Sequence, residues 1–360
     1  MAAAGLTGIF IGIESGSNRM QKILKKNNDL SLLYPVVKRC IKKGIDCKIS
    51  FMMGFPEETL ADLNDTLEMM LRLRLLNVMD PILNLLSPVP GTDIYYREKE
   101  NLVPVKDAAG FSNFVFQSAE LISLDKYHLI IKYPNIFSSF YNVRTKHIPL
   151  EFYRKLHLTY LYIFRHFSRS LYLFKKDLKL TCFEIFKAYF KYLEHKNLSL
   201  SEAKYFADFL RTKMKTRLSQ QLSDILHLEE TFLELSQNRG SDYPSQPANK
   251  MPSLKLIPCI SRNTAYQMFE YDVFKLYKHV NRSPKPAPST YVFSYLKDGY
   301  IKYRKLNAKE KVFLDLIRGE ETIEKMFNDF YKKFAAGTKE KEPLYILLDL
   351  VRDGFLFLKS

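Results

Sequence analysis

The chain has 360 residues, of which 46% are hydrophobic and 14% aromatic, so we expect a folded protein long enough for two or three domains. Its four cysteines are too few for a disulfide scaffold and lack any zinc-binding spacing, so we expect reduced thiols and no metal site in this chain. The sequence has no signal-peptide pattern and no uncharged run of about 18 residues, which predicts a cytoplasmic protein without a membrane span.

The net charge of +16 is unevenly distributed along the chain. Residues 1–110 contain 14 Lys and Arg against 13 Asp and Glu, so residues 111–360 contain 41 against 26, a net charge of +15. An acidic peptide, a nucleic acid or a membrane surface could each bind to such a surplus. Charge alone therefore leaves the class of partner open.

The first 100 residues alternate between strand and helix patterns. Continuous apolar runs predict buried parallel strands at 8–13, 47–54 and 81–88. A short helix follows the first strand, a second helix ends before Gly44, and a third begins at a capping box formed by Thr59 and Asp62. Strand–helix repeats of this length predict right-handed crossovers and a parallel sheet.

Residues 111–240 have few glycines and long helical stripes. Around 153–176, aromatic and aliphatic residues occupy one helical face, and Arg154, Arg165, Arg169 and Lys176 occupy another. Such a helix could lie on a membrane or a nucleic acid, but it is more typical of a packed helix with a solvated face.

Two polar stretches rich in proline, at 238–253 and 282–290, have the composition of linkers. After the second, two strand patterns flank the turn signal "KDG", and three amphipathic helices and a short apolar strand follow. A hairpin followed by three helices is the outline of a winged helix.

Three motifs in the first part of the chain occur in a fixed order. They are G-x-E-S-G at 12–16, G-F-P-x-E-T at 54–59 and P-x-P-G-T at 88–92, each at the end of a predicted strand. Together they resemble the second half of a radical S-adenosylmethionine (SAM) barrel, and the cobalamin-binding subgroup is the most similar. The resemblance implies an α/β fold with a partial TIM-like parallel barrel, and it leaves the use of cobalamin open.

The resemblance also implies a binding site for SAM at the carboxyl ends of the strands, where parallel sheets bind ligands. Glu14 would accept hydrogen bonds from the ribose or the amino group, Ser15 would support it, and Lys26 would face the methionyl carboxylate. The remaining implied cofactor-binding residues are Ser50, Met52, Gly54 and Ser87. Glu14 could instead make a structural hydrogen bond, and Glu57 and Thr59 could serve as helix caps as readily as ligand contacts.

Radical SAM chemistry requires a [4Fe–4S] cluster held by the cysteines of a C-x3-C-x2-C motif. That motif is absent from this sequence, and the resemblance starts at the fourth barrel strand. We therefore expect an N-terminally truncated or split product, for which a separate chain would supply the first half of the barrel. Such a chain should not cleave SAM reductively by itself, so whether it is an enzyme stays open.

The C-terminal segment resembles PqqD-like modules, which bind the leader of a ribosomal precursor peptide as an added edge strand. The predicted parts are the half barrel (1–110), a helical region (111–240), a linker with a short helix (241–287) and the PqqD-like module (288–360). The pairing implies a peptide-modifying enzyme of the methyltransferase type. The alternatives are a non-catalytic peptide-binding module and a basic winged-helix protein that binds nucleic acid, although Asp315, Glu320, Glu321 and Glu324 make the last module acidic.

Overall fold

The computed structural model describes most of the chain, and its residues form two compact units, 1–218 and 219–360, which we treat one at a time. The described residues are 2–76, 80–104, 141–200, 204–214, 219–237, 255, 257–260, 264–280, 285–295, 301–334, 342–352 and 355–359. The predicted linker at 238–253 and the predicted turn at 297–299 lie outside these residues, as do 282–284 of the second linker.

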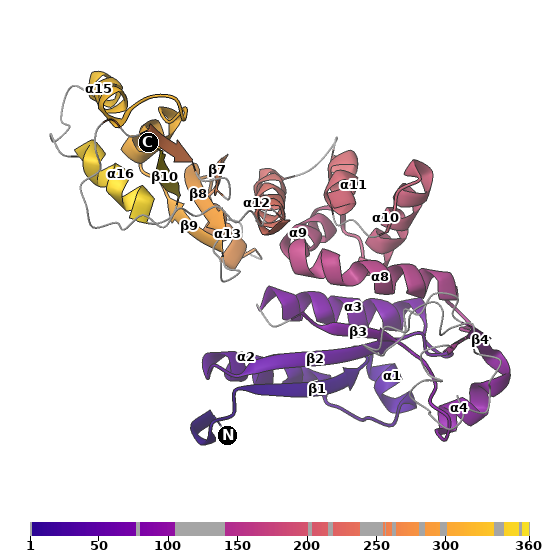
Figure 1. The fold of residues 1–360 in the computed structure, drawn as a ribbon. Helices are drawn as coiled ribbons and strands as arrows, with labels where there is room; N and C mark the ends of the chain where they lie inside the picture. Colours follow the sequence, from indigo (N-terminus) through magenta and orange to yellow (C-terminus); the bar gives the residue numbers. More distant parts are fainter. Residues whose placement is uncertain are drawn as a thin grey trace, which may run out of the picture. The chain divides into compact units, whose positions relative to one another are not determined.

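Unit 1 contains the predicted parallel sheet, with strands β1 (Gly8–Glu14), β2 (Asp46–Met53) and β3 (Ile82–Leu85) in the order β1-β2-β3 (Figure 1). Helices α1 (Asn18–Ile23) and α2 (Leu33–Lys42) connect β1 to β2, and α3 (Leu60–Leu75) connects β2 to β3. The mixed α/β class with a parallel sheet is therefore confirmed. Closure into part of a barrel stays a prediction.

The sheet is buried unequally. Ile49, Phe51 and Met53 of the central strand β2 are fully buried, whereas Phe10 of β1 is 63% exposed. The outer edge of β3 is covered by a helix, because the Leu83 N–H donates to the Tyr160 hydroxyl at 3.0 Å. The outer edge of β1 has no strand partner among the described residues, so β1 is the open edge of the sheet.

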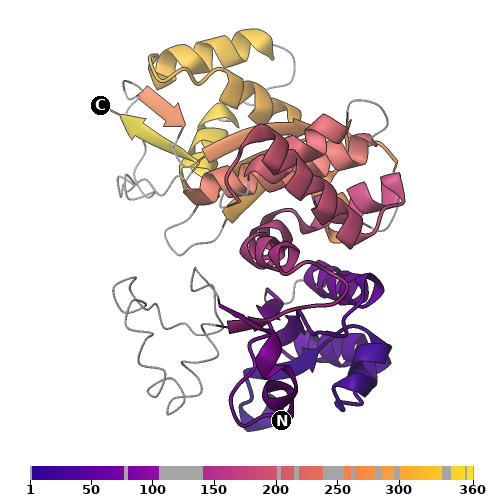
Figure 2. The ribbon, with the colours of Figure 1, turned by 90° about the vertical axis from the view of Figure 1, so that its right-hand side faces the viewer.

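The basic and aromatic stripe forms two helices, α8 (Leu150–His166) and α9 (Ser168–Leu178), with a break at Phe167. Its apolar face is buried, as predicted for a packed helix, but Arg169, which we expected on the solvated face, is also buried. Figures 1 and 2 show α3 between the sheet and these helices. Helix α10 (Cys182–Lys196) packs on α3, and α11 (Lys204–Met214) packs on α10.

Short elements complete unit 1. They are the 3-10 helices Ala2–Ala4, Leu30–Leu32 and Lys99–Asn101, the helix α4 (Asp93–Glu98), and the antiparallel strands β4 (Leu102–Pro104) and β5 (Tyr141–Val143).

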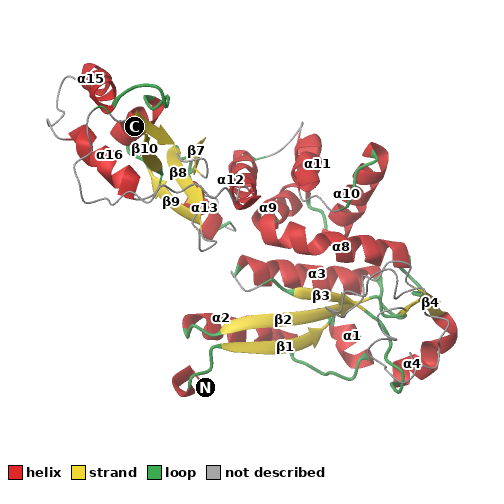
Figure 3. Ribbon diagram, viewed as in Figure 1, coloured by secondary structure: helices red, strands yellow, loops and turns green. Residues whose placement is uncertain are grey.

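Unit 2 combines an antiparallel sheet with helices (Figure 3). The sheet order is β7 (Thr264–Phe269), β8 (Ser289–Tyr295) and β9 (Ile301–Lys305), and β10 (Leu356–Lys359) pairs with β6 (Ile257–Ile260). The predicted hairpin is therefore β8–β9, and the three predicted helices are α14 (Ala308–Asp315), α15 (Ile323–Lys333) and α16 (Glu342–Arg352).

Two differences from the sequence prediction concern the start of unit 2. Strands β6 and β7 lie in the stretch predicted as a linker, which also contains the expected short helix α13 (Val273–Lys278). Helix α12 (Gln220–Gln237) was grouped with the helical region, but it packs on α13, β7 and β8. Its buried residues Leu222, Ile225 and Leu226 explain this position, because they need an apolar neighbour.

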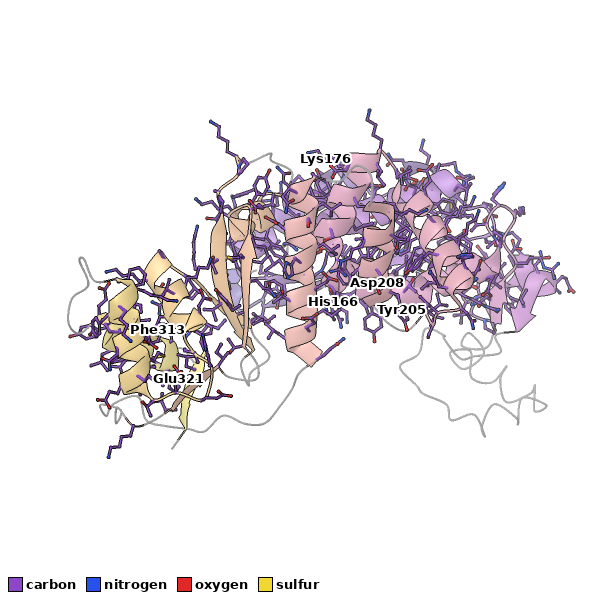
Figure 4. The ribbon with its side chains drawn as sticks, turned by 90° about the horizontal axis from the view of Figure 1, so that it is seen from above. His166, Lys176, Tyr205, Asp208, Phe313 and Glu321 are labelled. Atoms are coloured by element: carbon purple, nitrogen blue, oxygen red, sulfur yellow. The ribbon has the colours of Figure 1, made fainter. Side chains whose placement is uncertain are left out.

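The core of the C-terminal module surrounds Phe313, which Figure 4 shows among the side chains of α14 to α16. Met326, Phe330, Leu347 and Leu350 are buried with it. A winged-helix module stays a prediction. No helix in the described part of the chain has both the length and the apolar character needed to cross a membrane.

Candidate functional site

The segment from Glu14 to Ser17 leaves the carboxyl end of β1 in a strained conformation. Glu14 has a φ of 65°, in the left-handed region that side chains other than glycine rarely adopt, and the pairing with β2 shifts register between Gly12 and Glu14. Strained backbone of this kind often occurs at binding sites. Here the shift means that the Glu14 side chain does not follow the alternation of side chains between the two faces of the sheet.

The small residues after Glu14 are explained by contact with α3. A Cβ atom on Gly16 would lie 2.6 Å from the Asp65 carbonyl oxygen and 2.8 Å from the Thr66 Cα, so only glycine fits. The Thr66 hydroxyl accepts a hydrogen bond from the Gly16 N–H at 3.0 Å and lies 3.2 Å from the hydroxyl of the buried Ser15. The motif therefore docks the loop on α3 and fixes the position of Glu14.

A cavity of about 360 Å³ lies at the carboxyl ends of the strands, next to this loop. Its size falls in the range of small-molecule sites. The lining combines apolar side chains with charged ones of both signs. It consists of Glu14, Ile23, Leu24, Lys25, Lys26, Met52, Phe55, Glu57, Leu86, Asp93, Ile94 and Arg97.

Two ion pairs cross the lining of this cavity. The Lys26 Nζ lies 3.1 Å from Glu14 Oε1, and an Arg97 guanidinium nitrogen lies 3.0 Å from Glu57 Oε1. Arg97 also donates to the buried Glu98 at 2.8 Å, which orients its guanidinium. With Asp93 and Lys25, the cavity therefore offers three carboxylates and three cations to a ligand that carries charges of both signs.

The structure brings three of the implied cofactor-binding residues together, because Glu14, Lys26 and Met52 all line the cavity. Four others lie outside the lining that the described residues form. The Ser15 side chain is directed at Thr66 of α3, and Gly54 forms a left-handed turn with a φ of 84°. The buried Ser50 accepts a hydrogen bond from Asn84 at 3.4 Å, and Ser87 accepts one from Asn142 at 3.3 Å. The roles of all seven residues stay predictions.

Thr59 and Asp62 form the predicted capping box at the start of α3. The Asp62 carboxylate also accepts hydrogen bonds from Ser17 at 2.5 Å and from Arg19. Although burial opposes ionisation, the bonds from Arg19, Ser17 and Thr59 hold the pKa of Asp62 well below its usual range. This network joins α1 to α3 and makes the capping role of Thr59 the one that the geometry supports.

Two residues of this region escaped the sequence interpretation. Arg97 lies in α4, beyond the third motif, and nothing in its local pattern indicates that it reaches Glu57. Glu58 follows Glu57 directly, yet its side chain is fully buried and accepts the Gly54 N–H at 2.8 Å. The available signal was the adjacent pair of glutamates, because neighbouring side chains of a turn point in different directions. Glu57 lines the cavity, and Glu58 points into the protein.

The described cysteines do not fit an iron–sulfur cluster. Cys40, Cys47 and Cys182 belong to α2, β2 and α10, and the last two are buried. Within the described residues, no three His, Cys, Asp or Glu side chains are grouped as metal ligands would be. We therefore derive no chemical step through a cluster in this chain.

Comparison with known families gives one result for this region. Residues 1–70 match the family model of the Radical SAM superfamily. No curated protein matches the chain. The matched segment contains β1, β2, most of α3 and the three implied residues that line the cavity. In residues 1–70, the chain is therefore similar to the Radical SAM superfamily.

Proposed function

We propose that the cavity at the ends of β1 to β3 binds SAM. The observation that carries this proposal is the meeting of Glu14, Lys26 and Met52 on one cavity within the matched segment. SAM contains an apolar adenine face, ribose hydroxyls, an ammonium and a carboxylate. The cavity offers matching groups, namely apolar side chains such as Met52, carboxylates such as Glu14 and a cation at Lys26.

Binding of SAM to the full chain by isothermal titration calorimetry tests the proposal. Lys26→Ala and Glu14→Gln should each weaken binding roughly tenfold, because each removes one charge-assisted contact. Glu100→Gln is the matched control, since the Glu100 side chain is 86% exposed and lies outside the cavity lining. Absence of SAM binding by the unmodified chain, or equal binding by all four proteins, would contradict the proposal.

We propose further that unit 2 recognises an extended peptide and that the chain is part of a peptide-modifying, methyltransferase-type system. The supporting observation is the strand β9, which pairs with β8 on one side and has no strand on its other side among the described residues. Such an edge can accept a peptide through backbone hydrogen bonds. Cobalamin and a chain that supplies the first half of the barrel enter only through the family resemblance.

Two of the charges along β9 are paired within unit 2. Arg304 is paired with the buried Glu310, and Lys305 lies 2.9 Å from an Asp272 carboxylate oxygen. These internal pairs reduce the attraction for an acidic leader, so backbone pairing has to supply most of the affinity.

Titration of the full chain with a precursor peptide encoded nearby, and with duplex DNA, separates the two candidate functions of unit 2. The peptide should bind, and a version N-methylated at alternate residues should not, because it lacks the backbone donors that edge pairing needs. Salt-sensitive DNA binding without peptide binding would instead support the nucleic-acid interpretation.

A further inference from the structure

Glu58 is a buried carboxyl group that the predicted site does not use. Its side chain is fully buried between the turn after β2 and helix α8, and Oε2 accepts the Gly54 N–H at 2.8 Å. Glu58 also interacts with the hydroxyl of the neighbouring Tyr153, which favours the charged form, but neither Oε1 nor this hydroxyl makes a hydrogen bond of standard geometry among the described residues. A buried carboxylate with one unbonded oxygen is costly when it is ionised.

The charged and titratable groups that face Glu58 come from three helices. They are Arg19 of α1, Asp62 of α3 and Tyr153 of α8. Arg19 is already bound to Asp62 and to the Glu57 carbonyl, and the negative charge of Asp62 opposes a second one. Burial raises the pKa of Glu58 to about 7, so its charge changes in the neutral range.

The turn that Glu58 holds also forms one wall of the cavity. Gly54 has a φ of 84°, and the next residues place Phe55 and Glu57 on the lining. The Glu58 N–H donates to the Phe55 carbonyl at 3.0 Å, so the turn is closed at both ends by Glu58. Phe55 in turn packs with Met20 and Leu86 in a small core, next to Met52.

We propose that Glu58 is a positioning residue: its uncharged carboxyl group holds the 54–58 turn, and with it Phe55 and Glu57, in the geometry that forms the cavity. When Glu58 ionises, its burial penalises the charge more than the Gly54 N–H bond favours it, so water is drawn to the carboxylate and the turn loosens. The ligand-binding consequence of this inference rests on the proposed binding of SAM, but its structural part does not.

The methyl NMR signal of Met52 tests the structural part in the full chain without a ligand, and Met52→Leu assigns the signal. Between pH 5 and pH 9 the signal should shift with a midpoint near the pKa of about 7. In Glu58→Gln, which keeps a carbonyl acceptor for Gly54, the signal should stay at its low-pH position. The titration of the unmodified chain needs no variant, so the test survives if Glu58→Gln fails to fold.

The matched control is His157→Asn. His157 is a histidine of α8 that contacts β3, where its Nδ1 lies 3.1 Å from the Leu83 carbonyl oxygen, and burial lowers its pKa. The control should keep the Met52 titration. A Met52 signal that does not titrate near pH 7, that still titrates in Glu58→Gln, or that stops titrating in His157→Asn would overturn the inference.

A second measurement connects the turn to binding. The dissociation constant for SAM should rise about tenfold per pH unit above 7, because only the fraction with uncharged Glu58 is competent, and it should be independent of pH in Glu58→Gln. If the unmodified chain does not bind SAM at any pH, the proposed function fails, while the Met52 titration still decides the inference. If SAM binds equally at pH 6 and pH 8.5, the inference fails and the proposed function stands.

Discussion

Gly16, the second glycine of the first motif, offers a direct test of how the loop after β1 is held on α3. In Gly16→Ala the new Cβ would lie 2.6 Å and 2.8 Å from two backbone atoms of α3, so the loop or the helix has to move. Movement also weakens the Gly16 N–H bond to Thr66 and the contact between the Ser15 and Thr66 hydroxyls. Overpacking costs about 1–3 kcal/mol, and weakening the two hydrogen bonds adds about 1 kcal/mol in total, so we expect a loss of roughly 2–4 kcal/mol.

This loss is measured by unfolding the full chain in urea. Unfolding is monitored by hydrogen exchange and mass spectrometry of peptides from β1 and α3. The chain has no tryptophan, so a local probe of this kind replaces fluorescence. A slope of about 2 kcal/mol per molar urea converts the expected loss into a midpoint lower by roughly 1–2 M.

Gly8→Ala is the matched control for Gly16→Ala. The nearest atom to its Cβ would be the Asp46 carbonyl oxygen at 3.6 Å, an ordinary contact. Its midpoint should be unchanged or slightly higher, because alanine in a strand is about 0.5–1 kcal/mol more favourable than glycine. Equal midpoints for Gly16→Ala and Gly8→Ala would refute the assignment of Gly16 as a contact that only glycine permits.

Three further predictions concern unit 1 and the cofactor. Gly54→Ala should lower the free energy of unfolding by roughly 2–4 kcal/mol, because Gly54 has a left-handed φ and its new Cβ would lie 2.7 Å from Leu85 Cδ1. Gly44 also has a left-handed φ but faces open space, so Gly44→Ala should cost only about 1–2 kcal/mol. Equal losses in urea unfolding would contradict this difference. Because the pKa of Asp62 is lowered in the folded state, its stabilisation is present above pH 3.8 and lost as the pH falls further. Asp62→Asn should therefore be less stable at pH 7 and show a flatter acid transition, and an unchanged transition would contradict the network. Anaerobic reconstitution should leave the chain without a [4Fe–4S] cluster, and about four bound irons per chain would show that prediction to be wrong.

The sequence was most informative where structure depends on neighbouring residues. The three strands of the parallel sheet in unit 1 were predictable because each is a short apolar run between helical patterns. The start of α3 was predictable because Thr59 and Asp62 form a cap within four residues. The hairpin and the three helices of the C-terminal segment follow from similarly local signals.

The sequence was least informative where a residue depends on a distant partner. Gly16 is required by helix α3, about fifty residues later, and Arg97 reaches Glu57 from a helix beyond the third strand. The burial of Glu58 depends on α8. Arg169 lies on the helical face that was expected to be solvated, but it is buried by its packing in unit 1. Strand β6 has only four residues, and most side chains of β7 are half-buried, so neither sequence shows the alternation of a strand with one buried face.

The most direct test of the central claim is where SAM binds on the chain. Methyl-labelled methionine gives a probe in each unit, because Met52 lines the cavity of unit 1 and Met268 of unit 2 is 59% exposed. Addition of SAM to the full chain should shift the Met52 signal in a saturable way and leave the Met268 signal unchanged. Saturable binding that leaves Met52 unchanged, or that shifts only Met268, would contradict the claim that the strand-end cavity is the SAM site.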